Sequence, residues 1–353
     1  MKTNTRTIFV FICGLAVASS CFGQPRYTAK QIQFPAGFSS ASLSWISDDG
    51  KTGAGSGWSV FSAPACFTYQ DGSYTPLATP DFSCENVGPG NSRGEFVGTL
   101  LSRPAPGTDS VAANAFVYRN GDFIRFNDLL PGQPPISFAL GLNDNGDVAG
   151  VFQGVNQQIA FVYSNGEVRQ LPDLGVPWTT AYAINNSGDV VGDSVLPTDL
   201  GPEFVPVHAA LFPHEGGVID LGTFGGLRSS AVAINSKGQV VGWGNVDVNN
   251  SHAFFYDHGA MTEIMLPNGN AASINESGEV VGTYRPASDQ YQRAFYFANG
   301  KATDLNTLTV DLPAGVTLTN AQRINNGGLI LVWARTAADQ PLVQFLLTPV
   351  SGN

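Results

Sequence analysis

Charged side chains are scarce in this sequence: they make up 13% of its 353 residues, whereas glycine and proline number 41 and 22. Helices on a protein surface need a charged or polar face, which this composition supplies poorly. Abundant glycine and proline are instead typical of many short strands joined by tight turns. We therefore predict an all-β protein.

Cysteine is also rare, with four residues in the whole chain. Cys13 and Cys21 lie in the apolar N-terminal segment, so Cys66 and Cys84 remain for the rest of the chain. In an oxidising compartment such a pair predicts one disulfide bond.

Histidine is equally rare, and the sequence holds no serine-hydrolase elbow, no G-K-[ST] phosphate loop and no H-E-x-x-H zinc motif. His208 and His252 begin strands of a repeat, where a structural role at the strand edge is expected, and His214 and His258 follow in turns. Because the four do not converge, we predict no catalytic residue, no cofactor and no metal site.

The first 23 residues have the pattern of a signal peptide. Two basic residues precede an apolar run from Ile8 to Ala18, and small residues continue to Gly23. The run is too short to span a bilayer. We predict cleavage after Gly23 and an extracellular or periplasmic protein. Lipid attachment at Cys21 is less favoured, because Ala18 stands where lipoprotein signals usually carry leucine.

The remaining chain, 24–353, is acidic and is expected to form a single domain. Without Lys2 and Arg6, 15 basic residues face 28 acidic ones, which gives a net charge of −13. Such a charge repels nucleic acid, which we exclude as a partner. No later segment approaches the roughly 20 apolar residues of a membrane helix, so no transmembrane segment is expected.

A unit of four short strands repeats along the chain. In each copy an A-F-x-Y strand is followed by an Asp-Leu strand, an S-x-A-x-A-I-N strand and a V-V-G strand, each ended by a turn signal. Copies begin at Ala65, Asn114, Ala160, His208, His252 and Arg293, the first and the last being weaker.

An N-x-x-G pattern joins the last two strands of the unit. Its asparagine is Asn143, Asn185, Asn235, Asn275 or Asn325, with Asn91 and Ser47 in weaker copies. An asparagine oxygen can accept from backbone N–H groups two residues on, and glycine supplies a positive φ, so the pattern predicts a hairpin turn. Segment 143–147 also resembles a calcium loop, but it lacks the glutamate at the twelfth position, and the turn is favoured.

At these motifs the chain resembles the HAF-repeat family of predicted extracellular proteins. The matching residues are His252-Ala253-Phe254, the D-L-G-T-F-G-G segment 220–226 and the A-I-N-S-K-G-Q-V-V-G segment 233–242. The resemblance covers about residues 110–335 and thins before them, where Pro89 interrupts one strand. It implies export and repeats, and it carries over no catalytic residue.

The asparagine position recurs every 40 to 52 residues, seven times in all. This period with four strands per unit is that of β-propeller blades. We place the S-x-A-x-A-I-N strand innermost, V-V-G second, A-F-x-Y third and Asp-Leu outermost, with apolar residues packed between blades.

The chain ends test this arrangement. The last copy stops after a third strand at Leu342–Thr348, and the mature chain opens with an extra outermost strand at Ala29–Phe34. Pairing the two closes a seven-bladed ring and removes the exposed edge. An open solenoid or two smaller sandwiches are the alternatives.

In the propeller, the connections after outermost strands and after V-V-G strands emerge at one end. They are expected to gather aromatic and arginine side chains, which suit sugar or peptide ligands. The candidate ligand-binding residues are Trp58, Trp178, Phe224, Arg228, Trp243, Tyr284, Arg285, Trp333 and Arg335. For any single tryptophan, the alternative to a ligand contact is that its ring packs in the seam between two blades.

Two functions of different class remain. The favoured one is a secreted, non-enzymatic binding or scaffold propeller that recognises a glycan, an extracellular protein or a surface component. The alternative is a secreted polysaccharide hydrolase or lyase, which rests on analogy of fold alone. A carboxylate, a His or Tyr and an Arg within hydrogen-bond reach in one pocket would favour the enzyme.

Overall fold

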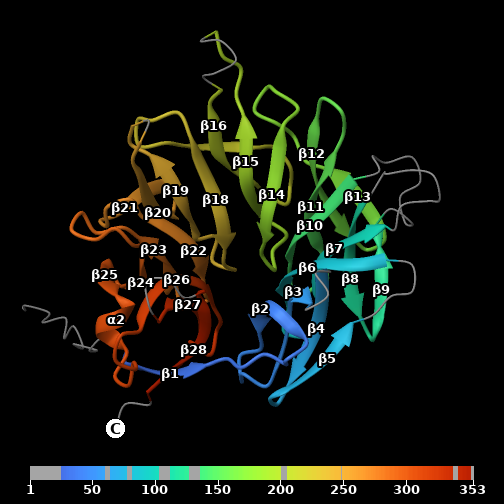
Figure 1. The fold of residues 1–353 in the computed structure, drawn as a ribbon. Coiled ribbons are helices and arrows are strands. Elements are labelled where there is room, and N and C mark those ends of the chain that lie inside the picture. Colours follow the sequence, from blue (N-terminus) through green and yellow to red (C-terminus); the bar gives the residue numbers. More distant parts are fainter. Residues whose placement is uncertain are drawn as a thin grey trace, which may run out of the picture.

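The computed structural model describes residues 25–59, 64–77, 82–102, 112–126, 136–199, 205–247, 249–336 and 341–350. Within them the chain forms seven four-stranded antiparallel sheets, which are the blades of a propeller (Figure 1). The predicted all-β, seven-bladed fold is confirmed. The proposed signal peptide lies outside the described residues. No helix in the described ranges is long and apolar enough to cross a membrane.

The strand order within the blades is the one predicted, and we number the blades 1 to 7 from β2 onward. The innermost strands are β2 (Phe38–Ile46), β6 (Phe82–Gly90), β10 (Ile136–Leu142), β14 (Thr179–Ile184), β18 (Ser229–Ile234), β22 (Asn270–Ile274) and β26 (Thr317–Ile324). The second strands are β3 (Thr52–Ser59), β7 (Phe96–Ser102), β11 (Val148–Gln153), β15 (Val190–Val195), β19 (Val240–Asn245), β23 (Val280–Tyr284) and β27 (Ile330–Arg335).

The outer half of each blade follows the same order. The third strands are β4 (Pro64–Gln70), β8 (Ala113–Arg119), β12 (Gln158–Ser164), β16 (Val207–Phe212), β20 (Ser251–Asp257), β24 (Arg293–Ala298) and β28 (Val343–Pro349). The outermost strands are β5 (Ser73–Leu77), β9 (Asp122–Arg125), β13 (Glu167–Gln170), β17 (Ile219–Gly222), β21 (Ala260–Ile264), β25 (Lys301–Asp304) and β1 (Tyr27–Gln31). One short helix, α2 (Leu305–Leu308), follows β25.

The antiparallel order gives the ring two distinct ends. The turn end carries the hairpins between first and second strands and between third and fourth strands. The loop end carries the connections between second and third strands and from each outermost strand to the next blade. Any site at one end is therefore built from a different set of segments than a site at the other.

The N-terminal strand closes the ring as predicted. β1 pairs with β28 from Tyr27 opposite Pro349 to Gln31 opposite Phe345, so blade 7 takes its outermost strand from the start of the chain (Figure 1). Tyr27 is 1% exposed and meets Tyr296 edge to face. This pairing covers the edge that β28 would otherwise present to solvent.

The V-V-G and A-F-x-Y motifs pack on each other within a blade. At Gly242 of β19, an added Cβ would lie 1.9 Å from the Ser230 carbonyl oxygen and 2.8 Å from the Phe254 ring. Gly98, Gly150 and Gly282 have a phenylalanine of the third strand at the same place. The glycine is thus needed because the phenylalanine ring covers the backbone there.

The cores lie between blades, as predicted. One cluster joins Val97, Ala115 and Val117 of blade 2 to Leu142 and Phe161 of blade 3, and comparable clusters fill other seams. Apolar side chains alternate along each strand, so each blade contributes one face to each neighbouring core. Propeller stability therefore depends on neighbouring blades staying together.

The predicted disulfide is present. Cys66 on β4 of blade 1 is bonded to Cys84 on β6 of blade 2, with their Cα atoms 5.6 Å apart. The bond joins two neighbouring blades. It closes a short loop, which on the chain-entropy argument stabilises the fold by about 3 kcal/mol.

Candidate functional site

The nine candidate ligand-binding residues lie toward the loop end, although not all of them lie in loops. The loop prediction was wrong for five of them: Trp58 belongs to β3, Trp243 to β19, Tyr284 to β23, and Trp333 and Arg335 to β27. These strands run on further than the sequence indicated, and the side chains of Trp243, Tyr284 and Trp333 are partly buried in the blades.

Two of the nine are strongly exposed aromatics. Trp58 is 54% exposed and Trp178 is 41% exposed. Phe224, by contrast, packs against a core cluster that contains Val191, Ala209 and Ala231. Phe224 therefore fits the alternative of a seam plug, whereas the two tryptophans present their rings to solvent.

Exposed apolar side chains gather at the loop end. Among the described residues, eight large hydrophobic side chains are between 41% and 96% exposed. Five of them lie at the loop end: Trp58, Val155, Trp178, Met265 and Leu342. Exposed apolar groups collected on one face are typical of a surface that contacts a partner.

A polar cluster on the loop end joins blades 6 and 7. The Tyr284 hydroxyl donates to Asp304 at 3.1 Å, and Arg293 pairs with the same carboxylate at 3.2 Å. The guanidinium of Arg335 lies 4.1 Å from the centre of the Tyr291 ring. Burial and the nearby Asp304 charge raise the pKa of Tyr284 to about 12. The cluster holds a carboxylate, a phenol and a guanidinium, but these groups pair with one another.

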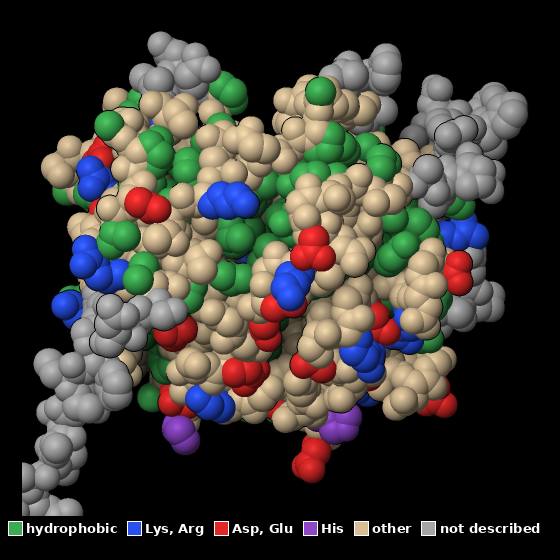
Figure 2. All heavy atoms as spheres, turned by 90° about the horizontal axis from the view of Figure 1, so that it is seen from below, with side chains coloured by type: hydrophobic (Ala, Val, Ile, Leu, Met, Phe, Trp, Pro, Cys, Tyr) green, Lys and Arg blue, Asp and Glu red, His purple; other side chains and the backbone are tan. Residues whose placement is uncertain are grey.

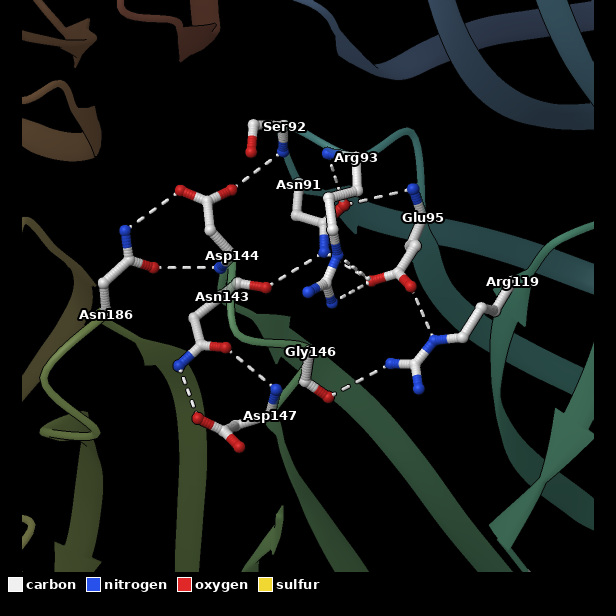
Figure 3. A network of polar contacts seen from close by, with 10 residues as sticks. All are labelled: Asn91, Ser92, Arg93, Glu95, Arg119, Asn143, Asp144, Gly146, Asp147 and Asn186. Atoms are coloured by element: carbon white, nitrogen blue, oxygen red, sulfur yellow. Dashed lines mark hydrogen bonds and ion pairs between the residues drawn. The ribbon is translucent and has the colours of Figure 1, made fainter. Parts of the chain in front are cut away.

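At the turn end, the asparagines of the N-x-x-G turns form a ring of hydrogen bonds around the axis. The Asn91 amide donates to the Asn143 carbonyl at 3.0 Å (Figure 3). The Asn143 amide donates in turn to the Asn185 carbonyl at 2.9 Å. Equivalent bonds of 2.8 to 3.2 Å continue through Asn235, Asn275 and Asn325 to Ser47. Six of the seven seams therefore carry this link, which the sequence analysis missed.

Each asparagine also builds its own turn, as predicted. The Asn235 side-chain oxygen accepts from the backbone N–H groups of Lys237 and Gln239, both at 3.1 Å. Its amide donates to the Gln239 side chain at 2.8 Å. The side chain thus makes three hydrogen bonds within its own hairpin, and its remaining amide hydrogen is used in the bond across the seam to Asn275.

A second set of contacts links successive turns nearer to solvent. Asp144 accepts from the Ser92 backbone N–H at 2.8 Å and from the Asn186 amide at 3.0 Å (Figure 3). Burial alone would raise the pKa of Asp144, but these hydrogen bonds outweigh it and lower the pKa. These contacts agree with the turn interpretation of segment 143–147. Within the described residues, no three His, Cys, Asp or Glu side chains gather as metal ligands.

Blade 2 carries an ion-pair network in the same region. Glu95 pairs with Arg93 and Arg119, each at 2.6 Å, and accepts from the Asn91 amide at 2.7 Å (Figure 3). Burial opposes the charge of Glu95, but the hydrogen bonds from Arg93 and Asn91 and the Arg119 charge lower its pKa overall. The carboxylate is held as a structural anion.

The turn end is acidic. Carboxylates in its hairpins are Asp48, Asp49, Asp71, Glu95, Asp122, Asp144, Asp147, Glu167, Asp189, Glu215, Asp257, Glu276 and Glu279, against the basic residues Lys51, Arg93, Arg119, Lys237 and Lys301. Seen edge-on, acidic and histidine side chains project along the lower edge, and hydrophobic side chains gather higher up (Figure 2). The two ends of the ring therefore differ in chemistry.

Two adjoining cavities occupy the axis. The mouth cavity, at the turn end, has a volume of about 580 Å³ and is rimmed by polar turn residues that include Asp48, Asp144 and Glu276. The inner chamber has a volume of about 400 Å³ and is lined by inner strands, with Tyr182 and Arg323 among its polar residues. Aliphatic residues such as Ile184 and Ile234 border both. None of the nine predicted ligand-binding residues lines either cavity.

A partly buried carboxylate lies beside the inner chamber, in the seam between blades 4 and 5. Asp193 accepts from the Ser230 hydroxyl at 2.9 Å. Burial raises the pKa of Asp193, and hydrogen bonds from Ser230, Thr180 and Tyr182 offset this only in part. Burial and the Asp193 charge also raise the pKa of Tyr182 to about 12.

The histidines that begin third strands pair with carboxylates on outermost strands. His208 Nδ1 lies 2.9 Å from Asp220, and His252 Nδ1 lies 2.6 Å from Glu263. Blade 6 places Arg293 and Asp304 at the same repeat positions. The structural role expected for these histidines is thus a contact with a carboxylate of the same blade. His258 is exposed in its turn.

No protein-family model matches the sequence, and no curated protein sequence matches it. Solved propellers share the fold. The β-propeller domain of the trilobed protease from Pyrococcus furiosus, described as having an open velcro topology, has a TM-score of 0.59 and 10% identity, over 88% of this chain and 94% of that chain. A puromycin-hydrolyzing peptidase from Mycobacterium tuberculosis has a TM-score of 0.52 and 12% identity, over 90% of this chain and 54% of that chain. Identities this low show the fold alone.

Proposed function

We propose that this protein is an exported, non-enzymatic binding propeller that recognises its ligand through the loop end. The observation that carries the proposal is the concentration of exposed apolar side chains there, five of eight among the described residues. Rigid blades with ligand-contacting connections at one end are a common arrangement for binding. Export is supported by the pattern of residues 1–23 and by the Cys66–Cys84 disulfide.

The ligand class follows from the mixture of side chains at that end. Aliphatic residues such as Val155, Met265 and Leu342 accompany the exposed rings of Trp58 and Trp178. Sugars stack on flat aromatic rings, whereas exposed aliphatic side chains suit a protein surface. We favour an extracellular protein and keep a glycan as the alternative ligand. We also infer membership of the HAF-repeat family, which rests on the motifs at 220–226 and 233–242.

The polysaccharide hydrolase or lyase gains little support. Tyr284, Asp304 and Arg293 meet the requirement of a phenol, a carboxylate and a guanidinium within reach. They line neither of the two axial cavities, and their polar groups bind one another. Catalysis needs such groups to face a bound substrate.

The test screens the purified mature protein against extracellular proteins and on a glycan array, and then measures variants by calorimetry. Trp58→Ala and Trp178→Ala should each weaken the ligand that is found by about 1 to 3 kcal/mol, as aromatic anchors do. Lys237→Ala, at the turn end, should leave affinity unchanged. Loss of binding in the Lys237 variant together with full binding in both tryptophan variants would show that the ligand uses the other end.

A further inference from the structure

The axial channel contains a guanidinium that pairs with nothing in the described part of the protein. Arg323 lies on β26 and borders both the mouth cavity and the inner chamber. Its side chain makes no hydrogen bond or ion pair with any described residue. By contrast, Arg93 and Arg119 pair with Glu95, and Arg293 pairs with Asp304.

The repeat itself does not require an arginine at this position. In four other blades the register of the innermost strands aligns Arg323 with the small residues Gly141, Ala183, Ala233 and Ser273, whereas blade 1 has Trp45 there. Those four blades form the same turn and the same asparagine link without a long side chain. Arg323 is therefore an addition to the repeat that projects into the space at the axis.

An unpaired charge in this place is unfavourable for the protein alone. Burial lowers the pKa of Arg323, and no carboxylate offsets that effect. Arginine nevertheless stays protonated in proteins. Arg323 is partly buried. A partly desolvated guanidinium gains from an ionic partner, which the described residues do not supply, so its presence is explained best by an anion that enters the channel.

The carboxylates nearest to the channel are already engaged at the rim. Asp48 accepts from the Asn326 backbone N–H at 2.9 Å, and Glu276 accepts from the Ser236 backbone N–H at 3.1 Å. Asp144 accepts from Ser92. None of them forms an ion pair with Arg323, but their free lone pairs can accept from hydroxyl or amino groups of a ligand.

We propose that the axial channel binds a small organic carboxylate, whose carboxylate group pairs with Arg323 and whose hydroxyl or amino groups meet the polar rim of the mouth cavity. The planar guanidinium matches a carboxylate in a two-pronged geometry. The cavity volumes of about 580 and 400 Å³ admit a molecule of the size of a sugar acid or an amino acid. This site is distinct from the loop end.

The test uses the mature protein and pairs of probes that differ in one carboxylate: glucuronate with glucose, and glutamate with glutamine. Binding is measured by calorimetry and by the rise in melting temperature. The acid of at least one pair should bind about 10- to 100-fold more tightly than its neutral partner, which is the range expected for a hydrogen-bonded charge pair. Arg323→Gln should abolish this difference, and Arg323→Lys should restore it only in part. Arg26→Gln, the same change at an exposed arginine that lines neither cavity, is the control and should bind as wild type.

The stability of the variants without probe separates a ligand site from a structural role. Arg323→Gln and Arg323→Met remove an unpaired charge and should melt at the wild-type temperature or above it. If both melt well below wild type, Arg323 has a structural partner and the proposal is wrong. It is equally overturned if neither acid binds more tightly than its neutral partner, or if Arg323→Gln keeps the preference. These outcomes leave the loop-end function untouched, because that function is tested at Trp58 and Trp178.

Discussion

The asparagine ring makes a quantitative prediction about the seams between blades. Asn235 is 2% exposed, and its side chain makes four hydrogen bonds: two accepted from its own turn, one donated to Gln239 and one donated to the Asn275 carbonyl at 3.1 Å. Asn235→Ala removes all four at once. The Asn275 carbonyl then loses its partner from the neighbouring blade.

The expected size of the effect follows from these bonds. A hydrogen bond within a protein contributes about 0.5 to 1.5 kcal/mol net, and a buried group left without a partner costs more. Since water can reach part of the turn from the mouth cavity, we expect a loss of about 3 kcal/mol in the free energy of unfolding. With an unfolding entropy of roughly 2.1 cal/mol/K per residue, this lowers the melting temperature by about 4 °C.

The assay is thermal and denaturant unfolding of the mature protein, with Lys237→Ala as the matched control. Lys237 lies in the same turn, but its side chain is exposed, and its replacement should change stability by less than about 0.5 kcal/mol. Asn235→Asp should be at least as destabilising as Asn235→Ala at neutral pH, because a carboxylate would face the acceptors of Gln239 and Asn275. If Asn235→Ala unfolds like Lys237→Ala, the ring of asparagines contributes nothing and the reasoning is refuted.

Three further predictions concern the seams and the closure of the ring. Replacing Cys66 and Cys84 by alanine should lower the free energy of unfolding by about 3 kcal/mol and speed hydrogen exchange first in blades 1 and 2; uniform exchange would contradict this. Asp193→Asn should be more stable than wild type at pH 7, because burial raises the folded pKa of Asp193 above its ordinary 3.8. The folded wild type binds the proton more tightly than the unfolded chain, so it loses stability relative to the variant as the pH rises from 3.8 through the folded pKa. A difference in melting temperature that does not change with pH would be evidence against this. Deleting residues 24–35 should expose the edge of β28, lower the melting temperature and cause aggregation on size-exclusion chromatography; an unchanged monomer would argue against closure by β1.

Much of the fold could be predicted because each blade repeats the same local rules. The N-x-x-G pattern predicted the turns, and the incomplete last copy with the extra first strand predicted how β1 closes the ring. The Cys66–Cys84 pairing followed from counting cysteines and from placing them on neighbouring blades. All of these depend on residues close in sequence or on a simple count.

Contacts between blades could not be predicted in the same way. The Asn185 amide reaches the carbonyl of a residue 50 positions later, and no local pattern distinguishes that bond from one to water. Arg323 was passed over because it stands in an ordinary inner strand, and only the assembled channel shows that it lacks a partner among the described residues. One signal was available: four of the aligned copies carry the small residues Gly141, Ala183, Ala233 and Ser273 at its position, and a charged residue there is a visible departure.

The asparagine ring and the disulfide cross different seams of the propeller. Ser47 stands where the other blades carry asparagine, and its hydroxyl is used within its own turn, on Asp49 and Thr52. Among the described residues, the seam between blades 1 and 2 therefore lacks the amide link that the other six seams have. That seam is the one that the Cys66–Cys84 bond crosses. A covalent link thus stands where the repeated hydrogen bond is absent, and every seam is tied to its neighbour by one of the two.

The two ends of the ring differ in whether their side chains form contacts that hold neighbouring blades together. At the turn end, the asparagines and the carboxylates beside them are largely engaged in holding neighbouring turns together. The exposed apolar side chains of the loop end, such as Trp58 and Trp178, have no such commitment. This difference is the physical reason for seeking the partner at the loop end and for treating Arg323, the unpaired group on the axis, as a separate site.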